Sequence, residues 1–227
     1  ITKKPRALKP SSVETIPFAA MEAIPQDGTY APSYTLRAPN AIASGTYFEP
    51  RDVLLAKITP SFENGKQALA LDLNAPFGYA TTEVIPLHPR EAGHDPRFLF
   101  FYLLHPDVRH YVADRMEGST GRQRVPESVL LDLPIPSLES NEQLSIANAL
   151  ETIQRAAATE IQCECVTQQL KRVAMHTLFT RGLRGEDSKE TEIGPMPTSW
   201  APRTVLDLCE IWSGGTPRKA KAEYWAG

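Results

Sequence analysis

The sequence predicts an α+β protein: a mixed domain with a strongly twisted sheet and short helices, followed by a long coiled-coil-forming helix. Twenty prolines against 13 glycines argue against a pure helical bundle, because proline ends a helix when it falls in the interior. Short apolar runs separated by turn residues fill the first 136 positions. A stripe of about forty residues with helical spacing then follows.

The chain is long enough for one main core and an extension. It has 227 residues, of which 41% are apolar and 22% are charged. We expect a first domain over residues 1–138, a spacer helix over 139–182, a linker over 183–196, and a final segment over 197–227.

Within the first domain, residues 52–58 and 67–73 read as strands. Asn64-Gly65 lies between them and is a strong hairpin signal. From residue 95 to 117 the apolar side chains are instead spaced as in a helix. We expect two short helices with a break at His105-Pro106, because a residue before proline disfavours the α conformation.

The long helix is the clearest pattern in the sequence. Residues 133–136 are extended because of their prolines, and Ser140 to Gln143 form a plausible cap. Gly182 and Gly185 end the helix, which would be roughly 60 Å long. A narrow apolar stripe of this length favours pairing with another helix, and the alternative is a surface helix on its own domain. The predicted pairing residues are Leu150, Ile153, Ala157, Ile161, Leu170 and Val173.

The polar stretch through Glu192 reads as a linker, and Val205 to Trp212 reads as a strand-like run. Ser213 to Pro217, with Gly214 and Gly215, would close that run. These residues would be the start of a second domain.

Charge and composition restrict the classes of function. The net charge of −3 and the pI of about 6.0 argue against a protein that coats nucleic acid, so any DNA contact must be local. Three cysteines, two of them in the helical stripe at 163 and 165, suit neither a disulfide framework nor a zinc site. No apolar run approaches the roughly eighteen residues of a membrane span, so we expect a cytoplasmic protein.

The best DNA-contact segment is residues 118–125, with the sequence GSTGRQRV. Gly118 and Gly121 allow close backbone approach to a phosphate, and Ser119 and Thr120 offer hydroxyls. Arg122 and Arg124 offer planar donors, and Gln123 can pair with adenine. The alternative is a common polar loop.

A second candidate segment for DNA contact is residues 57–66, where a strand ends in a turn that carries Lys57, Ser61, Asn64 and Lys66. An ordinary solvated hairpin tip is the alternative. Residues 81–83 could add a polar contact, although threonines are also good strand formers.

Catalytic signatures are weak. Residues 74–77 (NAPF) differ by one position from the Asn-Pro-Pro-aromatic loop of amino-methyltransferases, but no glycine-rich loop for S-adenosylmethionine accompanies them. The sequence has no Walker phosphate loop and no nuclease arrangement of acidic residues and lysine. His176 has no partner four residues away for a metal. We expect no catalytic residue, metal ligand or cofactor.

The ordered combination of these segments closely resembles the specificity subunits of type I restriction-modification systems. The matching segments are 52–66 (DVLLAKITPSFENGK), 80–83 (ATTE), 118–125 (GSTGRQRV), 133–136 (LPIP), Glu142-Gln143 with the long helix, Pro197 with Trp200, and 213–217 (SGGTP). The resemblance covers nearly the whole chain.

The resemblance implies a non-catalytic subunit that reads half of a bipartite site in double-stranded DNA. In that family, two target-recognition domains are held apart by helices that pair as an antiparallel coiled coil. Those helices dock methyltransferase subunits, and through them the restriction and translocase subunit. A homodimer through the long helix is a further expectation. A nuclease or methyltransferase fragment, and an assembly scaffold without DNA readout, are the alternatives.

The chain departs from the family pattern at its start. Family domains usually open with a strand that begins at a tryptophan, and here the one copy of that element starts at Trp200. The chain therefore looks like a truncated product or a natural half-subunit. We hypothesise that the C-terminal segment supplies the missing first strand to its own or a partner's recognition domain.

Overall fold

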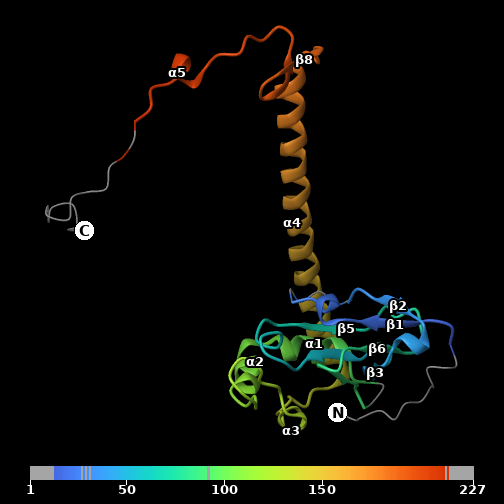
Figure 1. Cartoon of the computed structure of the whole chain (residues 1–227). Helices are drawn as coiled ribbons and strands as arrows, with labels where there is room; N and C mark the ends of the chain where they lie inside the picture. Colours follow the sequence, from blue (N-terminus) through green and yellow to red (C-terminus); the bar gives the residue numbers. More distant parts are fainter. Residues whose placement is uncertain are drawn as a thin grey trace, which may run out of the picture. The chain divides into compact units, whose positions relative to one another are not determined.

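The structure is a computed structural model that describes residues 13–26, 28, 30, 32–90, 93–212 and 214. The chain divides into two compact units, Ile1–Glu160 and Ile161–Gly227, and the division falls inside a single long helix. Each unit is described by itself below. The mixed sheets and the long helix confirm the predicted α+β class (Figure 1).

The first sheet of unit 1 has four short strands in the order β2-β1-β6-β3. The strands are β1 (Ile16–Ala19), β2 (Thr35–Arg37), β3 (Thr46–Phe48) and β6 (Gly78–Ala80). The pairing of β1 with β6 is parallel, while the other two pairings are antiparallel. The sheet is therefore mixed, and two three-residue 3-10 helices, Met21–Ala23 and Pro39–Ala41, lie in the connections between its strands.

The second sheet is antiparallel and has the order β5-β4-β7. Its strands are β4 (Val53–Ala56), β5 (Gln67–Leu69) and β7 (Val84–Leu87). Strands β4 and β5 confirm the two predicted strands, and Val53 pairs with Leu69. The loop between them spans ten residues, so Asn64-Gly65 ends a longer connection and does not form a two-residue hairpin turn.

Strand β4 is buried on both faces, which explains its unbroken apolar sequence. Val53 and Leu55 point to one face and pack in a cluster with residues of the short helices. Leu54 points to the other face and packs with Ala19, Phe48 and neighbours from both sheets. The second sheet is thus the middle layer of unit 1, between the first sheet and the helices.

Three short helices cover the second sheet: α1 (Pro96–Leu104), α2 (Pro106–Ala113) and α3 (Glu127–Leu131). Helix α1 begins at Asp95, whose Oδ1 accepts a hydrogen bond of 2.8 Å from the Arg97 amide. The helical conformation is interrupted between α1 and α2 at His105 and Pro106, as predicted. Phe100 and Leu103 of α1 are buried against the sheet.

Helix α4 (Ser140–Arg181) confirms the predicted long helix and has 42 residues. Its buried residues are Gln143 and Ala147, both in the first two turns. Gly182 follows at a φ of 65°, and its amide donates to the Leu178 carbonyl. Glycine is favoured there because a side chain would strain this left-handed conformation.

Unit 2 corrects the predicted linker over residues 183–196. Strands β8 (Ser188–Thr191) and β9 (Gly194–Pro197) form an antiparallel hairpin. Lys189 Nζ donates to the carbonyls of Thr198 and Trp200, and the Trp200 ring packs edge-on against Phe179 of α4. The polar composition suggested a linker, but these side-chain contacts hold a two-stranded element on the end of the helix.

The strand predicted over residues 205–212 is also wrong for its first half, which forms the short helix α5 (Val205–Leu208). Thr204 and Asp207 form a capping box in which each side chain accepts from the other's backbone amide. This local cap outweighs the strand preference of the apolar residues. Gly214 is described, while Ser213 and residues 215–217 of the predicted closing motif lie outside the described residues.

Candidate nucleic-acid interface

Three polar segments predicted separately from the sequence lie together in unit 1. The Lys57 amide donates to the Glu83 carbonyl at 2.9 Å, and the Val125 amide donates to the Lys57 carbonyl at 2.8 Å. The Thr59 amide donates to the Gln123 carbonyl at 3.0 Å. We call residues 57–66, 81–83 and 117–125 the polar loop cluster. Backbone hydrogen bonds join the three segments, so the segments have fixed positions relative to one another.

Two backbone hydrogen bonds between Glu117 and Arg124 close the loop at residues 118–123. The Arg124 amide donates to the Glu117 carbonyl, and the Glu117 amide donates to the Arg124 carbonyl. Gly118 has a φ of 129°, and a Cβ there would lie 2.8 Å from the Arg122 carbonyl oxygen. Only glycine fits this turn. Ser119, Thr120, Gly121 and Arg122 are consequently exposed at the tip.

Arg124 forms a two-pronged ion pair with Glu83 at the surface of the polar loop cluster. Arg124 Nε lies 2.9 Å from Glu83 Oε2, and Nη2 lies 2.7 Å from Oε1. The hydrogen bond from Arg124 holds the pKa of Glu83 below its ordinary value, and the same bond raises the pKa of Arg124. Both side chains are therefore charged at neutral pH.

In the loop at residues 57–66, some of the side chains predicted to contact DNA are exposed, and others bond within the protein. Asn64 is exposed, and Lys57 and Ser61 are half-buried. Lys66 Nζ instead donates to the Met21 carbonyl at 2.8 Å, so its ammonium group is bonded to the protein's own backbone. Thr59 donates to Glu63, and the Thr59-Pro60 peptide bond is cis.

The Arg109 side chain contacts the loop at residues 57–66 from the protein interior, and the sequence analysis did not identify it. Its guanidinium donates to the carbonyls of Phe62 and Leu103 and to Gln67 Oε1, and it lies over the Phe62 ring. Phe62 and Gln67 are buried. Burial lowers the pKa of Arg109 to about 10, so it remains charged at neutral pH. The helical pattern around Arg109 gave no signal that its side chain turns inward.

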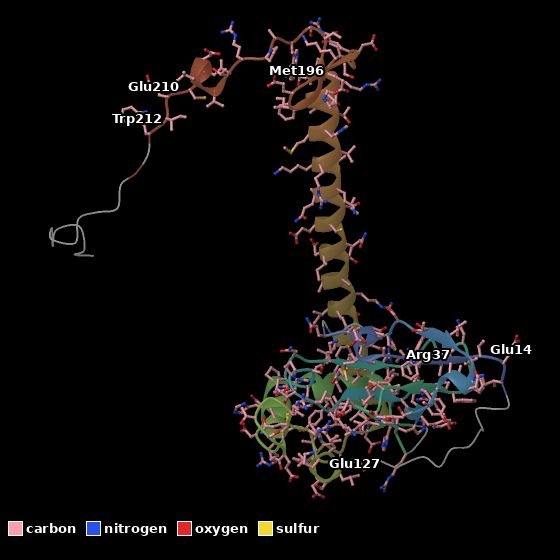
Figure 2. All side chains as sticks on the ribbon, in the orientation of Figure 1. Glu14, Arg37, Glu127, Met196, Glu210 and Trp212 are labelled. Atoms are coloured by element: carbon pink, nitrogen blue, oxygen red, sulfur yellow. The ribbon has the colours of Figure 1, made fainter. Side chains whose placement is uncertain are left out.

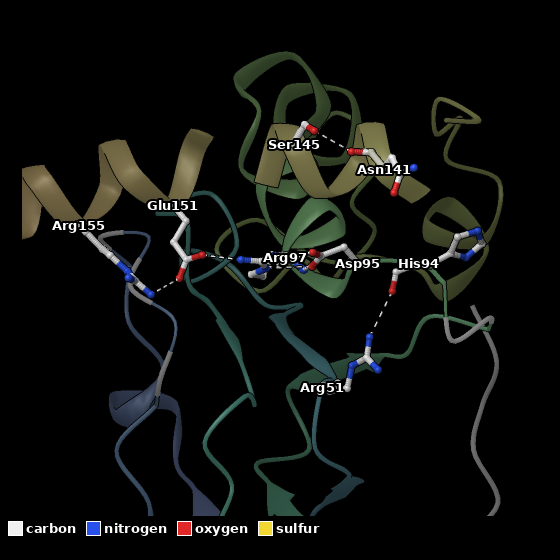
Figure 3. A network of polar contacts seen from close by, with 8 residues as sticks. All are labelled: Arg51, His94, Asp95, Arg97, Asn141, Ser145, Glu151 and Arg155. Carbon is white, nitrogen blue, oxygen red and sulfur yellow. Dashed lines mark hydrogen bonds and ion pairs between the residues drawn. The ribbon is translucent and has the colours of Figure 1, made fainter. Parts of the chain in front are cut away.

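A second missed network joins α1 to the start of α4 (Figure 3). Arg97 pairs with Asp95 at 2.6 Å and with Glu151 at 2.5 Å, and Glu151 also pairs with Arg155. Hydrogen bonds to Asp95 and Glu151 raise the pKa of Arg97. Burial and the charge of Glu151 raise the pKa of the nearby Tyr30 to about 12.

Asp52 and His88 form a third polar contact that the sequence did not indicate. His88 Nδ1 lies 2.5 Å from Asp52 Oδ1, and Asp52 Oδ2 accepts from the Glu49 amide. Asp52 is buried at the start of β4, and His88 directly follows β7. The contact ties the ends of two paired strands together.

The NAPF segment at residues 74–77 has a structural role. Phe77 of the NAPF segment is buried and stacks on Tyr47, as expected for a core residue. Among the described residues, no group of three or more histidine, cysteine or acidic side chains could hold a metal ion. Within the same residues, no helix is sufficiently long and apolar to cross a membrane.

The apolar stripe of α4 is uncovered in the single chain. The exposed fraction is 66% for Ile153, 65% for Ile161, 66% for Leu170 and 63% for Val173, and Leu150 is exposed at 37%. Ala157 is also exposed. Figure 2 shows side chains standing out from α4 along its length. The predicted pairing residues are thus available on the surface of the helix.

Comparison with known proteins adds independent information. No protein-family model matches the chain. The specificity subunit of the type I restriction enzyme EcoEI from Escherichia coli is 32% identical over 108 residues, which are 48% of this chain and 18% of that protein. The EcoAI specificity subunit from Escherichia coli is 29% identical over 157 residues, or 69% of this chain and 26% of that protein.

The chain is similar to the specificity subunits of type I restriction enzymes. The structural comparison shows that the fold is similar to that of two solved chains. The HsdS subunit of Thermoanaerobacter tengcongensis matches with a TM-score of 0.58 at 15% identity, over 94% of this chain and 53% of that chain. A chain from a type I R-M system structure matches with a TM-score of 0.59 at 16% identity, over 93% and 53%. The chain thus spans about half the length of those solved chains and a smaller share of the two curated relatives.

Proposed function

We propose that the chain is a non-catalytic DNA-recognition subunit of a type I restriction-modification system that reads half of a bipartite duplex target. The polar loop cluster carries this proposal. Backbone hydrogen bonds hold hydroxyl, amide and guanidinium groups from three distant segments at one surface. Base readout needs such fixed donors and acceptors, with other groups left to anchor phosphates.

The local charge of the polar loop cluster predicts a modest dependence of binding on salt. Lys57, Arg122 and Arg124 contribute positive charge, while Glu83 neutralises Arg124. A slope of log affinity against log salt is about −0.9 for each phosphate contact. With few cations available, we expect a slope of roughly −2 to −3 and not the steep values of proteins that coat DNA.

A binding experiment tests this proposal. The full chain is measured by fluorescence anisotropy on duplexes enriched from a randomised library, at two salt concentrations. Arg122→Ala should weaken binding, and Arg172→Ala, an exposed arginine of α4 in the other unit, is the matched control. Equal affinity for enriched and random duplexes would favour an assembly scaffold that does not read DNA.

The non-catalytic assignment has its own test. The full chain is incubated with duplex DNA, Mg²⁺ and S-adenosylmethionine, and cleavage and methyl transfer are followed over time. We expect neither, because we attribute the chemistry to partner subunits. Either activity would contradict the proposal and favour a nuclease or methyltransferase fragment.

Helix α4 is proposed as the spacer that pairs with a second such helix. In the complete complex it would also bind methyltransferase subunits, and through them the restriction and translocase subunit. The exposed apolar stripe supports this role, since such a surface favours contact with another helix. A second copy of this chain is the simplest partner for the isolated protein.

Sedimentation velocity tests helix pairing. Ile153→Asp places a charge in the stripe and should shift the chain towards monomer. Thr159→Asp is the control, because Thr159 is exposed and, at 100° per residue, lies roughly opposite the part of the stripe that holds Ile153, which is Leu150, Ile153, Ala157 and Ile161. Identical association of the two variants would argue against pairing through the stripe.

A further inference from the structure

The Glu83–Arg124 pair holds one edge of the guanidinium and leaves the other edge open. Nε and one Nη2 hydrogen of Arg124 face the Glu83 carboxylate. An arginine guanidinium has five N–H donors in a planar fork. Both Nη1 hydrogens and the second Nη2 hydrogen therefore remain, and Nη1 has no hydrogen-bond partner among the described residues.

The backbones of both residues are fixed, so the open edge has a defined position. Arg124 is bonded to Glu117 through two backbone hydrogen bonds, and its neighbours bond to Lys57 and Thr59. The Glu83 carbonyl accepts from the Lys57 amide, and Glu83 lies within a turn in which the Val84 amide donates to the Thr81 carbonyl. The Arg124 side chain is 51% exposed, which leaves its free edge accessible to a ligand.

Two parallel donors on one planar edge match a specific acceptor pattern in DNA. Guanine presents O6 and N7 as adjacent acceptors in the major groove, and arginine pairs with both at once. A carboxylate on the other edge fixes the rotation of the guanidinium. Less conformational freedom is then lost when the base is bound.

The carboxylate also makes Arg124 a poor phosphate ligand. A phosphate at the free edge would experience repulsion from Glu83, and the pair is electrically neutral as a whole. Guanine carries no net charge and avoids this repulsion. Arg122 differs, because it lies exposed at the loop tip with no side-chain hydrogen bond among the described residues, and it suits phosphate better.

We propose that Glu83 is a specificity-determining positioning residue that orients Arg124 for two-pronged recognition of guanine and disfavours phosphate contact by the same side chain. This inference rests on the proposed DNA-reading function and adds the base class to it. The lowered pKa of Glu83 agrees with the geometry, since the carboxylate stays charged under ordinary binding conditions.

The test compares selection by the wild-type chain and by variants, using a randomised duplex library followed by sequencing. Glu83→Gln keeps the size of the side chain and removes its charge. Arg124→Lys keeps a charge and removes the planar fork. Glu22→Gln is the matched control, because Glu22 is an exposed glutamate of unit 1 that lies outside the polar loop cluster. Thermal unfolding of each variant verifies its fold.

The wild-type chain should select guanine at one position. Arg124→Lys should reduce that preference by roughly 5- to 100-fold. Glu83→Gln should reduce it by about tenfold, while affinity for random duplex rises and the salt slope steepens by about one unit. Glu22→Gln should leave the guanine preference unchanged.

Two results would overturn the inference separately from the function. The first is full guanine selection by Glu83→Gln, and the second is an equal loss of affinity for all duplexes in that variant. A wild-type chain that selects no sequence at all would overturn the proposed function as well.

Discussion

At the scale of single residues, Arg109 links the buried core to the polar loop cluster. Its guanidinium donates to the Phe62 carbonyl, and Phe62 lies in the loop that also carries Lys57, Ser61 and Asn64. The same guanidinium bonds Gln67, which is fully buried. Nη1 and Nη2 of Arg109 serve three acceptors, while its buried Nε has no partner among the described residues, so removing the guanidinium leaves several acceptors unsatisfied.

We therefore expect Arg109→Met to lower the free energy of unfolding by about 2–4 kcal/mol. Chemical denaturation measures the loss. Arg115→Met is the control, because the Arg115 side chain is exposed, donates to the Tyr111 carbonyl and lies over the Tyr111 ring. That variant should cost less than about 1 kcal/mol. Similar losses in the two variants would show that Arg109 has no special role.

The candidate site could be predicted from sequence only in pieces. Glycine and arginine content identified residues 118–125, and turn residues identified residues 57–66. Their meeting depends on backbone hydrogen bonds between segments about 60 residues apart, as between Thr59 and Gln123. The pairing of Glu83 with Arg124, 41 positions apart, also depends on tertiary structure. No local pattern encodes these contacts.

At the scale of elements, the network of Arg97 joins helix α1 to α4 within unit 1 (Figure 3). Arg97 and Glu151 have side chains that are 19% and 14% exposed, so water screens their attraction only partly. Asp95 holds the other edge of the guanidinium. The first turns of α4 are thereby tied to the domain, next to the buried Ala147.

Arg97→Met should lower the free energy of unfolding by about 2 kcal/mol, because Asp95 and Glu151 lose a shared partner. For a chain of this size, the melting temperature should fall by roughly 4–8 °C. Differential scanning calorimetry measures this change. Arg155→Ala is the control, since Arg155 is 78% exposed and pairs with Glu151 on the same helix. A change of the same size in the control would contradict the role of Arg97.

The success of prediction differed between elements for physical reasons. Strand β4 was predictable because burial on both faces leaves an unbroken apolar run, and helix α4 was predictable because its apolar residues keep helical spacing. The β8–β9 hairpin was missed, since its residues are polar and it is held by single contacts such as those of Lys189. Helix α5 was missed because the Thr204–Asp207 cap outweighed the apolar pattern behind it.

At the scale of the whole molecule, the C-terminal segment carries apolar side chains without cover. The exposed fractions are 84% for Leu206, 68% for Leu208, 78% for Ile211 and 86% for Trp212. Soluble proteins rarely leave contiguous groups of this kind uncovered. We propose that this segment completes a recognition domain, either its own or that of a second copy.

Removing residues 202–227 tests that proposal while leaving the β8–β9 hairpin and Trp200 in place. If the segment completes a domain, the shortened chain should unfold at a lower temperature or associate more weakly, because buried apolar area is lost. Calorimetry and sedimentation equilibrium measure the two quantities. Unchanged values for both would contradict the proposal.

The central claim is that the polar loop cluster contacts duplex DNA, and hydrogen exchange measured by mass spectrometry tests it most directly. The full chain is compared with and without a duplex enriched from the randomised library. Amides of residues 118–123 and 57–66 should exchange more slowly in the complex, while those of β8 and β9 should not change. Protection confined to other segments, or none at saturating DNA, would contradict the account.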